Sequence, residues 1–387
     1  MRHIKRIVEI TQEFLEIPSA ISFEQPFLKY LNKRAKKLGF KTNLHEQYLH
    51  IRPKKNDHTK KLFSMHIDRH SLIKNDEGEL EYLAFYLKKK SSSRFSFEEI
   101  ESMEREVVEK INQIDNLKCQ LRDNFFIIKE EDNKTLKMER SGRKIFFESI
   151  GLRHTHENIK SYSPRSGRIK REYKTCRYDI SIKDKKVKFD TNKPLKRGDE
   201  IFMLSNEVYF DKKVISGQID NVISAAVIFY IMELSEFNQE ALFTTKEEIG
   251  ESYKSVKEFY DEHIFNKENT EQTTNLSLVI LDTSPYLSLD EKERGFLTLR
   301  NGDERGIFDE KLGKKIKQIT KEKKIPYHLK PTDTGKTELG TVIKETKGKI
   351  NGTTIQLPTT NYHTTYETCT KESLKNYYRV IRELSKK

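Results

Sequence analysis

The spacing of hydrophobic and polar residues predicts that the chain begins with helices and continues into strands. Within residues 1–18, apolar side chains recur at intervals of three and four, which is typical of an amphipathic helix. A second helix is predicted between Pro26, near its first turn, and Gly39, which ends it. A pair of strands is expected next, at about 47–52 and 61–67.

The middle of the chain, from about residue 75 to residue 207, has a different pattern. An amphipathic helix is predicted near 96–114. Short segments of alternating hydrophobicity are predicted to be strands at 125–129, 144–147 and 186–189, with glycine and charged residues between them. This pattern indicates an insertion of β character that contains one helix.

After Val214 the alternation of strands and helices resumes. An almost wholly apolar helix is predicted at about 221–234, and strands are predicted at 241–245, 276–281 and 295–299. Strands that alternate with helices favour an α/β fold, in which a mixed or parallel sheet is covered by helices on both faces.

These patterns divide the chain into two predicted domains. Residues 1–74 and 208–387 are expected to form one discontinuous α/β domain with a mixed sheet. Residues 75–207 are expected to form a smaller, β-rich inserted domain with one helix.

Composition is consistent with a folded protein that has a highly charged surface. The chain has 387 residues, with 73 Lys or Arg and 60 Asp or Glu, so its formal net charge is +13. With 35% hydrophobic residues it can bury a sizeable core. The longest apolar run, Ser224–Met232, is about half of the roughly 20 residues needed to cross a bilayer. We therefore expect no transmembrane helix and no association with a membrane.

Cysteine usage and the N-terminus favour the cytoplasm. The three cysteines, Cys119, Cys176 and Cys369, are odd in number and widely spaced, so they predict neither a disulfide framework nor a thiolate metal site. The N-terminal segment lacks the unbroken apolar stretch of a signal peptide.

Positive charge is concentrated in residues 141–200, which hold 17 Lys or Arg and 8 Asp or Glu. Such a segment could contact nucleic acid or steer acidic ligands. Solvated loops of a small β-rich domain are the more common origin of such charge, and the segment contains no nucleic-acid-binding motif with interleaved aromatic residues. We therefore favour the loops and do not expect nucleic acid as a partner.

Histidines and acidic residues recur where the predicted strands end. In open α/β sheets, ligands and catalytic groups gather at the carboxyl ends of strands, so we expect these side chains to meet. Asp68 follows His66 by two positions, so on a strand it would share a face with His66 and could orient its imidazole. Imidazole and carboxylate ligands suit zinc, cobalt and manganese. The candidate residues are His66, Asp68, Asp220, Glu247, Glu248, Asp282 and His363.

In this order and context, the sequence resembles the glutamyl and deblocking aminopeptidases, which carry two metal ions and assemble as tetrahedral particles. The motifs that carry the resemblance are SMHID at 64–68, GQIDN at 217–221, FTTKEEIG at 243–250, LDTS at 281–284 and NYHTTYE at 361–367. Three flanking segments, LIKNDEGEL at 72–80, LKRGDEIFML at 195–204 and IPYHLKPTDTGKTELG at 325–340, are also similar to the family.

The resemblance implies a role for each candidate residue. Asp220 would bridge two divalent metal ions, with His66 and Asp282 completing the shell of one ion and Glu248 and His363 that of the other. Glu247 would be the general base, and Asp68 would support His66. Zinc is the expected metal, with cobalt or manganese as alternatives. A pair of such ions lowers the pKa of a shared water and holds the substrate carbonyl.

The sequence also departs from the family pattern. The bridging aspartate is followed by Asn221 and Val222 instead of Asp-Arg, and related enzymes often have a cis peptide bond here, so we predict one between Asp220 and Asn221. After Asp68 the family usually has Glu-Val-Gly, whereas this chain has Arg69, His70 and Ser71. The glycine-rich turn expected after Gly250 is replaced by 251–254. We interpret these changes as affecting substrate preference more than metal binding.

The preferred hypothesis is a metal-dependent aminopeptidase that removes N-terminal residues from short peptides. An enzyme of the same fold with another substrate, a carboxypeptidase or an amide deacylase, is the first alternative. A non-catalytic relative that binds polyanions through residues 141–200 is the second. The resemblance also implies a homo-oligomer whose subunit contacts involve the inserted domain.

Overall fold

A computed structural model describes most of the chain outside the insertion and several strands within it. The described residues are 2–17, 19–54, 60–74, 80–90, 126–131, 135–140, 149–150, 178–183, 186–191, 200–203, 208–210, 213–265, 276–285, 295–360, 362–363 and 367–386. The helix predicted near 96–114 and the strand predicted at 144–147 lie outside these residues, as does most of the basic segment 141–200.

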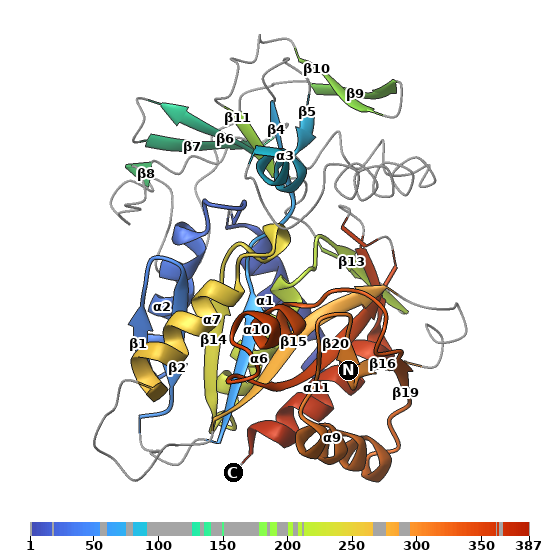
Figure 1. Ribbon diagram of the computed structural model, residues 1–387. Helices are drawn as coiled ribbons and strands as arrows, with labels where there is room; N and C mark the ends of the chain where they lie inside the picture. Colours follow the sequence, from blue (N-terminus) through green and yellow to red (C-terminus); the bar gives the residue numbers. More distant parts are fainter. Residues whose placement is uncertain are drawn as a thin grey trace.

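An eight-stranded mixed sheet organises the larger part of the molecule (Figure 1). The central pairs β14–β3, β3–β15 and β15–β20 are parallel, whereas β1–β2, β2–β14 and β20–β16 are antiparallel. The edge pair β16–β19 is again parallel. In spatial order the strands are β1 (Lys41–Leu44), β2 (Tyr48–Arg52), β14 (Glu240–Thr244), β3 (Lys61–His66), β15 (Ser277–Pro285), β20 (Gly352–Thr359), β16 (Leu297–Arg300) and β19 (Tyr327–Lys330).

Helices cover both faces of this sheet, as the sequence pattern predicts. Alternation along the strands divides the core in two, so that Phe63 and Val279 join one hydrophobic cluster while Leu62 and Leu278 join the other. The first cluster contains side chains of α1 (Arg2–Leu15), α2 (Gln25–Lys37), α6 (Val222–Glu233), α9 (Glu310–Glu322) and α11 (Lys371–Ser385). The second contains side chains of α7 (Tyr253–Tyr260) and α10 (Glu338–Glu345).

The apolar helix α6 is buried around its whole circumference, since it lies between α1 and the sheet. This explains why its sequence shows no polar face. None of the helices in the described ranges combines the length and the apolar character that a membrane crossing requires.

A separate six-stranded sheet lies above the large sheet in Figure 1. Its strands, in spatial order, are β5 (Leu80–Tyr82), β4 (Ser71–Lys74), β11 (Glu200–Met203), β6 (Phe126–Glu131), β7 (Thr135–Arg140) and β8 (Ser149–Ile150). The strand β4 therefore pairs with the insertion, although residues 71–74 fall in the first predicted domain. The helix α3 (Leu83–Lys90) follows β5 and contacts the turn that carries Glu247.

Smaller elements complete the fold. A three-stranded sheet joins β12 (Tyr209–Phe210), β13 (Val214–Gly217) and β21 (Glu367–Thr370). Two hairpins are formed by β9 (Tyr178–Lys183) with β10 (Lys186–Thr191) and by β17 (Gly302–Asp303) with β18 (Gly306–Ile307). The 3₁₀-helix η2 (Glu247–Ile249) follows β14, and the π-helix η3 (Asp261–Phe265) follows α7.

Two local predictions are wrong. The strands β2 and β3 are not a pair, because β14 lies between them and pairs with both. Asp282 does not end its strand, because β15 runs on to Pro285 in register with β20. The strand β1 was not predicted, since its sequence KTNL offers little apolar alternation.

Candidate active site

The fold brings the seven candidate residues together at the carboxyl ends of the central strands. His66 is the last residue of β3, while Glu247 and Glu248 follow β14 in the short helix η2. Asp220 precedes α6. His363 lies in the loop between β20 and β21. The predicted cis peptide bond between Asp220 and Asn221 is present.

Asp220 lies between two histidines. His66 Nε2 lies 3.3 Å from Asp220 Oδ1, and His363 Nε2 lies 3.7 Å from Asp220 Oδ2. On the first side, Asp282 Oδ1 lies 3.5 Å from His66 Nε2. On the second side, Glu248 Oε2 lies 3.8 Å from His363 Nε2. The two halves thus have one histidine and one carboxylate each and share Asp220.

Buried oxygens test whether this arrangement suits a cation. Neither carboxylate oxygen of Asp220 has a hydrogen-bond partner among the described residues, although His66 approaches one of them, and Glu248 Oε1 has none either. A buried carboxylate oxygen without a donor is costly unless a cation or a proton satisfies it. The ligand atoms of His66, Asp220 and Asp282 all lie within 4.8 Å of one another, so these residues fit a metal ion.

The pKa values of the cluster point the same way. Burial raises the pKa of Glu248 well above its ordinary value, and the charge of Asp220 raises it further. Burial alone would lower the pKa of His66, but the carboxylates of Asp220, Asp282 and Asp68 raise it well above its ordinary value. Both shifts favour the protonated form of these groups, so a positive charge among the carboxylates, whether a proton or a cation, stabilises the cluster.

Asp68 holds the Glu247–Glu248 turn as well as His66. Its Oδ1 lies 3.6 Å from His66 Nδ1, and its backbone carbonyl oxygen is the nearer partner of that nitrogen, at 3.3 Å. The contact does not arise in the predicted way, because β3 ends at His66 and the two residues do not share a strand face. The Asp68 carboxylate accepts hydrogen bonds from the backbone N–H groups of Glu247 and Glu248, each at 3.0 Å. Asp68 thus contacts three candidate residues, one through its backbone carbonyl and two through its carboxylate.

Glu367 has a positioning role that the sequence did not reveal. Its carboxylate accepts hydrogen bonds from the backbone N–H groups of Asp220 and His363, both at 2.8 Å. His363 has a φ of 64°, a left-handed conformation that a side chain favours only when its surroundings hold it. The acidic residue at the end of the NYHTTYE motif was the available signal.

Glu24 supports the other side of the same turn. Its Oε1 accepts hydrogen bonds from the backbone N–H of Ser22 at 2.9 Å and that of Lys246 at 3.3 Å. Lys246 has a φ of 60° immediately before η2, so this contact helps to hold a left-handed residue. Burial raises the pKa of Glu24 to about 8, and the charge of Asp68 contributes to the increase.

This pKa predicts a pH effect on stability. The folded pKa of Glu24 lies above the ordinary value of 4.5, so its contribution to stability is complete below pH 4.5 and is lost as the pH rises towards 8. Glu24→Gln stays neutral and should not lose stability in this way. The wild type should therefore lose about 2–3 kcal/mol more unfolding free energy than the variant between pH 6 and pH 9. Urea unfolding measures this difference. Glu322→Gln, on the exposed side of α9, is the control, and an equal gain there would contradict the assignment.

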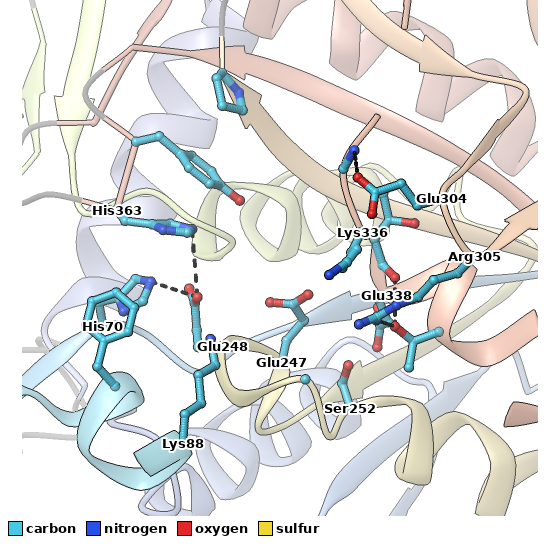
Figure 2. Close-up of a pocket in the computed structure, with 17 residues that line it drawn as sticks. His70, Lys88, Glu247, Glu248, Ser252, Glu304, Arg305, Lys336, Glu338 and His363 are labelled. Carbon is cyan, nitrogen blue, oxygen red and sulfur yellow. Dashed lines mark hydrogen bonds and ion pairs between the residues drawn. The ribbon is translucent and has the colours of Figure 1, made fainter. Parts of the chain in front are cut away.

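A cavity of about 510 Å³ opens beside the cluster (Figure 2). In Figure 2, the Glu247 side chain lies between Glu248 and Glu338. The cavity is lined by acidic and basic side chains, and the basic ones include Lys88 from α3, Arg305 and Lys336. Its size falls within the range of small-ligand sites. Loss of water and the charges of Glu248, Asp282 and Glu338 raise the pKa of Glu247 well above its ordinary value, against the opposing effect of His66.

The three departures after Asp68 have different surroundings. The Arg69 side chain is fully buried and points to the loop after α1, where its Nε donates to Ser19 Oγ at 2.8 Å. His70 lies against Glu248, with 2.7 Å between His70 Nε2 and Glu248 Oε2, and burial lowers the pKa of its imidazole to about 3. Ser71 begins β4. His70 contacts the candidate site through Glu248.

A mixed β-sheet covered by helices, with a histidine–carboxylate cluster at its strand ends, suits a metal-dependent hydrolase. The family model for M42 glutamyl aminopeptidases matches residues 149–380. The chain therefore belongs to the M42 glutamyl aminopeptidase family, and it is a metallo-aminopeptidase, a hydrolase that acts on peptide bonds.

Solved structures share the fold over nearly the whole chain. The aminopeptidase APDkam598 from Desulfurococcus kamchatkensis has a TM-score of 0.62 at 14% identity, with 99% of this chain and 95% of that chain covered. The TET aminopeptidase from Thaumarchaeota archaeon SCGC AB-539-E09 has 0.62 at 13% identity, covering 99% and 96%. The TET1 peptidase of Pyrococcus horikoshii has 0.57 at 15% identity, covering 98% and 99%. A comparison with curated proteins gave no match.

Proposed function

We propose that the chain removes N-terminal residues from short peptides with the help of two divalent cations, and that Glu247 is the general base. The observation that carries the proposal is the position of Asp220 between two histidine–carboxylate groups, beside a cavity that Glu247 lines. Membership of the M42 family favours this substrate class over the carboxypeptidase and deacylase alternatives. The polyanion-binding alternative rests on a segment that lies mostly outside the described residues.

The proposed ligands follow the two halves of the cluster. His66, Asp282 and Asp220 would hold one cation, and Glu248, His363 and Asp220 the other. Two cations in these positions supply positive charge that polarises the scissile carbonyl and makes water more acidic. Zinc is our proposal for the physiological metal, because an imidazole on each side suits it.

The chain's own residues would move the proton. A carboxylate with a raised pKa can take a proton from the attacking water near neutral pH and return it to the leaving amine. Glu247 meets this requirement, since it lines the cavity and its pKa is raised. Asp68 would keep Glu247 in place through the backbone N–H of that residue. Water attack and C–N cleavage then leave Glu247 in its starting state.

Hydrolysis of matched peptides by metal-stripped and reloaded protein tests this function. Di- to hexapeptides with free N-termini should be shortened from that end only after zinc, cobalt or manganese is added. The same peptides with acetylated N-termini show whether a free N-terminus is required. Cleavage without metal would contradict the metal requirement, and release of residues from the C-terminus would contradict the proposed removal of N-terminal residues.

We also propose that the chain self-associates in the cytoplasm. The Pyrococcus horikoshii TET1 peptidase, which shares the fold, assembles into a tetrahedron or a large octahedral shell. A further solved structure of the same fold, that of PhTET1-12s, contains a dodecamer in the asymmetric unit. Light scattering tests this proposal, and a particle mass equal to that of one chain would contradict it.

A further inference from the structure

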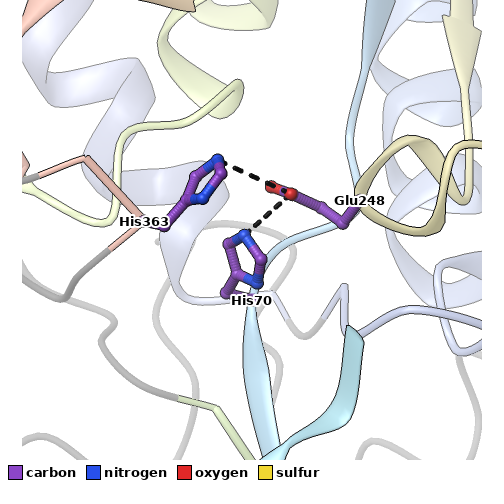
Figure 3. Close-up of side chains that lie close together, drawn as sticks. All are labelled: His70, Glu248 and His363. Atoms are coloured by element: carbon purple, nitrogen blue, oxygen red, sulfur yellow. Dashed lines mark ion pairs between the residues drawn. The ribbon is translucent and has the colours of Figure 1, made fainter. Parts of the chain in front are cut away.

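A third histidine lies on the Glu248 side of the cluster. His70 Nε2 is 2.7 Å from Glu248 Oε2, and His363 Nε2 is 3.8 Å from the same oxygen. The two imidazole rings are adjacent, with 4.3 Å between their centroids. Figure 3 shows both rings pointing towards the Glu248 carboxylate from two different segments of the chain. The ligand atoms of the three residues all lie within 4.8 Å of one another, a spacing that one metal ion can span.

The backbone around His70 holds the imidazole in this position. Arg69 donates its backbone N–H to Ser19 O at 2.9 Å, and its guanidinium donates to Ile17 O at 2.7 Å. On the other side, the Gln218 amide donates to the carbonyl oxygen of His70. The His70 residue is only 4% exposed. A ligand held by its neighbours loses little conformational freedom when a metal binds.

The two halves of the cluster are therefore chemically different. Among the described residues, the metal-binding group on the Asp282 side contains one histidine, His66, whereas His70 and His363 both face Glu248 on the other side. Nitrogen ligands favour zinc over manganese, while a set dominated by carboxylates suits manganese better. An additional imidazole should thus raise both the affinity and the selectivity of one position only.

We propose that His70 is an additional ligand of the cation held by Glu248, His363 and Asp220, and that it makes this position selective for zinc over manganese. The inference rests on the proposed two-cation site and adds to it a ligand that the M42 resemblance did not assign. An alternative role for His70 is to orient Glu248 by a hydrogen bond without contacting metal. A glutamine at position 70 separates the two roles, because it can donate a hydrogen bond to Glu248 but has no imidazole nitrogen to bind a metal.

Metal affinity separates these roles without relying on activity. Zinc and manganese dissociation constants are measured on the full chain by equilibrium dialysis and metal analysis. The variants are His70→Val, which restores a residue usual in the family, and His70→Gln, which keeps an N–H donor but loses the imidazole. His50→Val is the matched control, because His50 is also buried and lies 2.6 Å from a glutamate, Glu240, away from the cluster.

Both His70 variants should weaken zinc binding about 10- to 100-fold at one of two positions, a loss at least as large as that from removing a supporting partner of a ligand. The affinity for manganese should fall less, so the ratio of zinc affinity to manganese affinity should decrease. The control His50→Val should change neither dissociation constant. Zinc affinity that survives in His70→Gln would overturn the proposal in favour of an orienting role. Unchanged affinity in His70→Val, or equal losses at both positions, would overturn it too.

The same measurements separate this inference from the proposed function. A wild-type chain that binds no cation would overturn both. If the wild type binds two cations and His70→Val binds them with unchanged affinity, only the role of His70 is overturned. Two bound cations of which one weakens in His70→Val would support the role of His70 even if Glu247 proved not to be the base.

Discussion

Replacing Glu247 with glutamine should lower the kcat of peptide hydrolysis by about 10²- to 10⁴-fold, the range attributed to a positioned general base. Glutamine has nearly the same shape but cannot accept the proton of the attacking water. The backbone N–H of residue 247 would still donate to Asp68, so the η2 turn should stay folded. The KM should change little, because the substitution removes a proton acceptor and leaves the lining of the cavity in place.

Two measurements make this prediction specific. Metal content should match that of the wild type, since Glu247 is outside the two proposed ligand sets. Glu304→Gln is the matched control, because Glu304 also lines the cavity but its carboxylate accepts from the backbone N–H of Gly335 on the other side. A Glu247→Gln variant that keeps its kcat would exclude the base role. A variant that loses metal would instead make Glu247 a ligand.

The candidate site was more predictable from the sequence than the details of the fold that hold it. The positions of His66 and Glu248 follow from one rule, that parallel strands present their carboxyl ends at one edge, and Asp282 lies near that edge although its strand runs on to Pro285. The rule needs only the order of strands and helices, which hydrophobic periodicity reveals. It does not need the strand order in space, and the predicted β2–β3 pairing was wrong without consequence for the site.

The supporting residues could not be predicted because their contacts depend on distant pairing. Glu367 reaches Asp220 because β21 pairs with β13, an antiparallel contact between segments far apart in the chain. Glu24 reaches Lys246 because the loop before α2 lies beside the end of β14. A lone acidic residue in a highly charged chain gives no sign of such a contact before the fold is known.

His70 is a different case, because the residue was noticed in the sequence and the proposal above now gives it another meaning. It replaces a valine usual in the family, and the change was interpreted as affecting substrate preference more than metal binding. The structure places its imidazole on Glu248, a proposed metal ligand. A histidine four positions after His66 was a usable signal, because a chain that leaves a strand end can return a side chain to the same edge.

Replacing Asp220 with asparagine should remove both cations and reduce peptide hydrolysis to the background rate. The Asp220 carboxylate faces both His66 and His363, at 3.3 and 3.7 Å. Asparagine keeps the size but loses the charge and one of the two acceptor oxygens, so the two halves no longer share an anionic ligand. Metal analysis should find about two cations per wild-type chain and fewer than one per variant chain.

Asp282→Asn provides the matched control for this prediction, because Asp282 lies beside His66, on one side of the cluster. That variant should lose one cation and keep the other, so equal losses in both variants would contradict a shared role for Asp220.

The stability of the metal-free Asp220→Asn protein shows whether the loss of metal comes from a damaged fold. After burial, the charge of Asp220 is a main cause of the raised pKa values of Glu248 and Glu367. Metal-free Asp220→Asn should therefore resist urea better than the metal-free wild type, because one of several mutually repelling buried charges is gone. Lower stability would show that the loss of metal reflects a damaged fold.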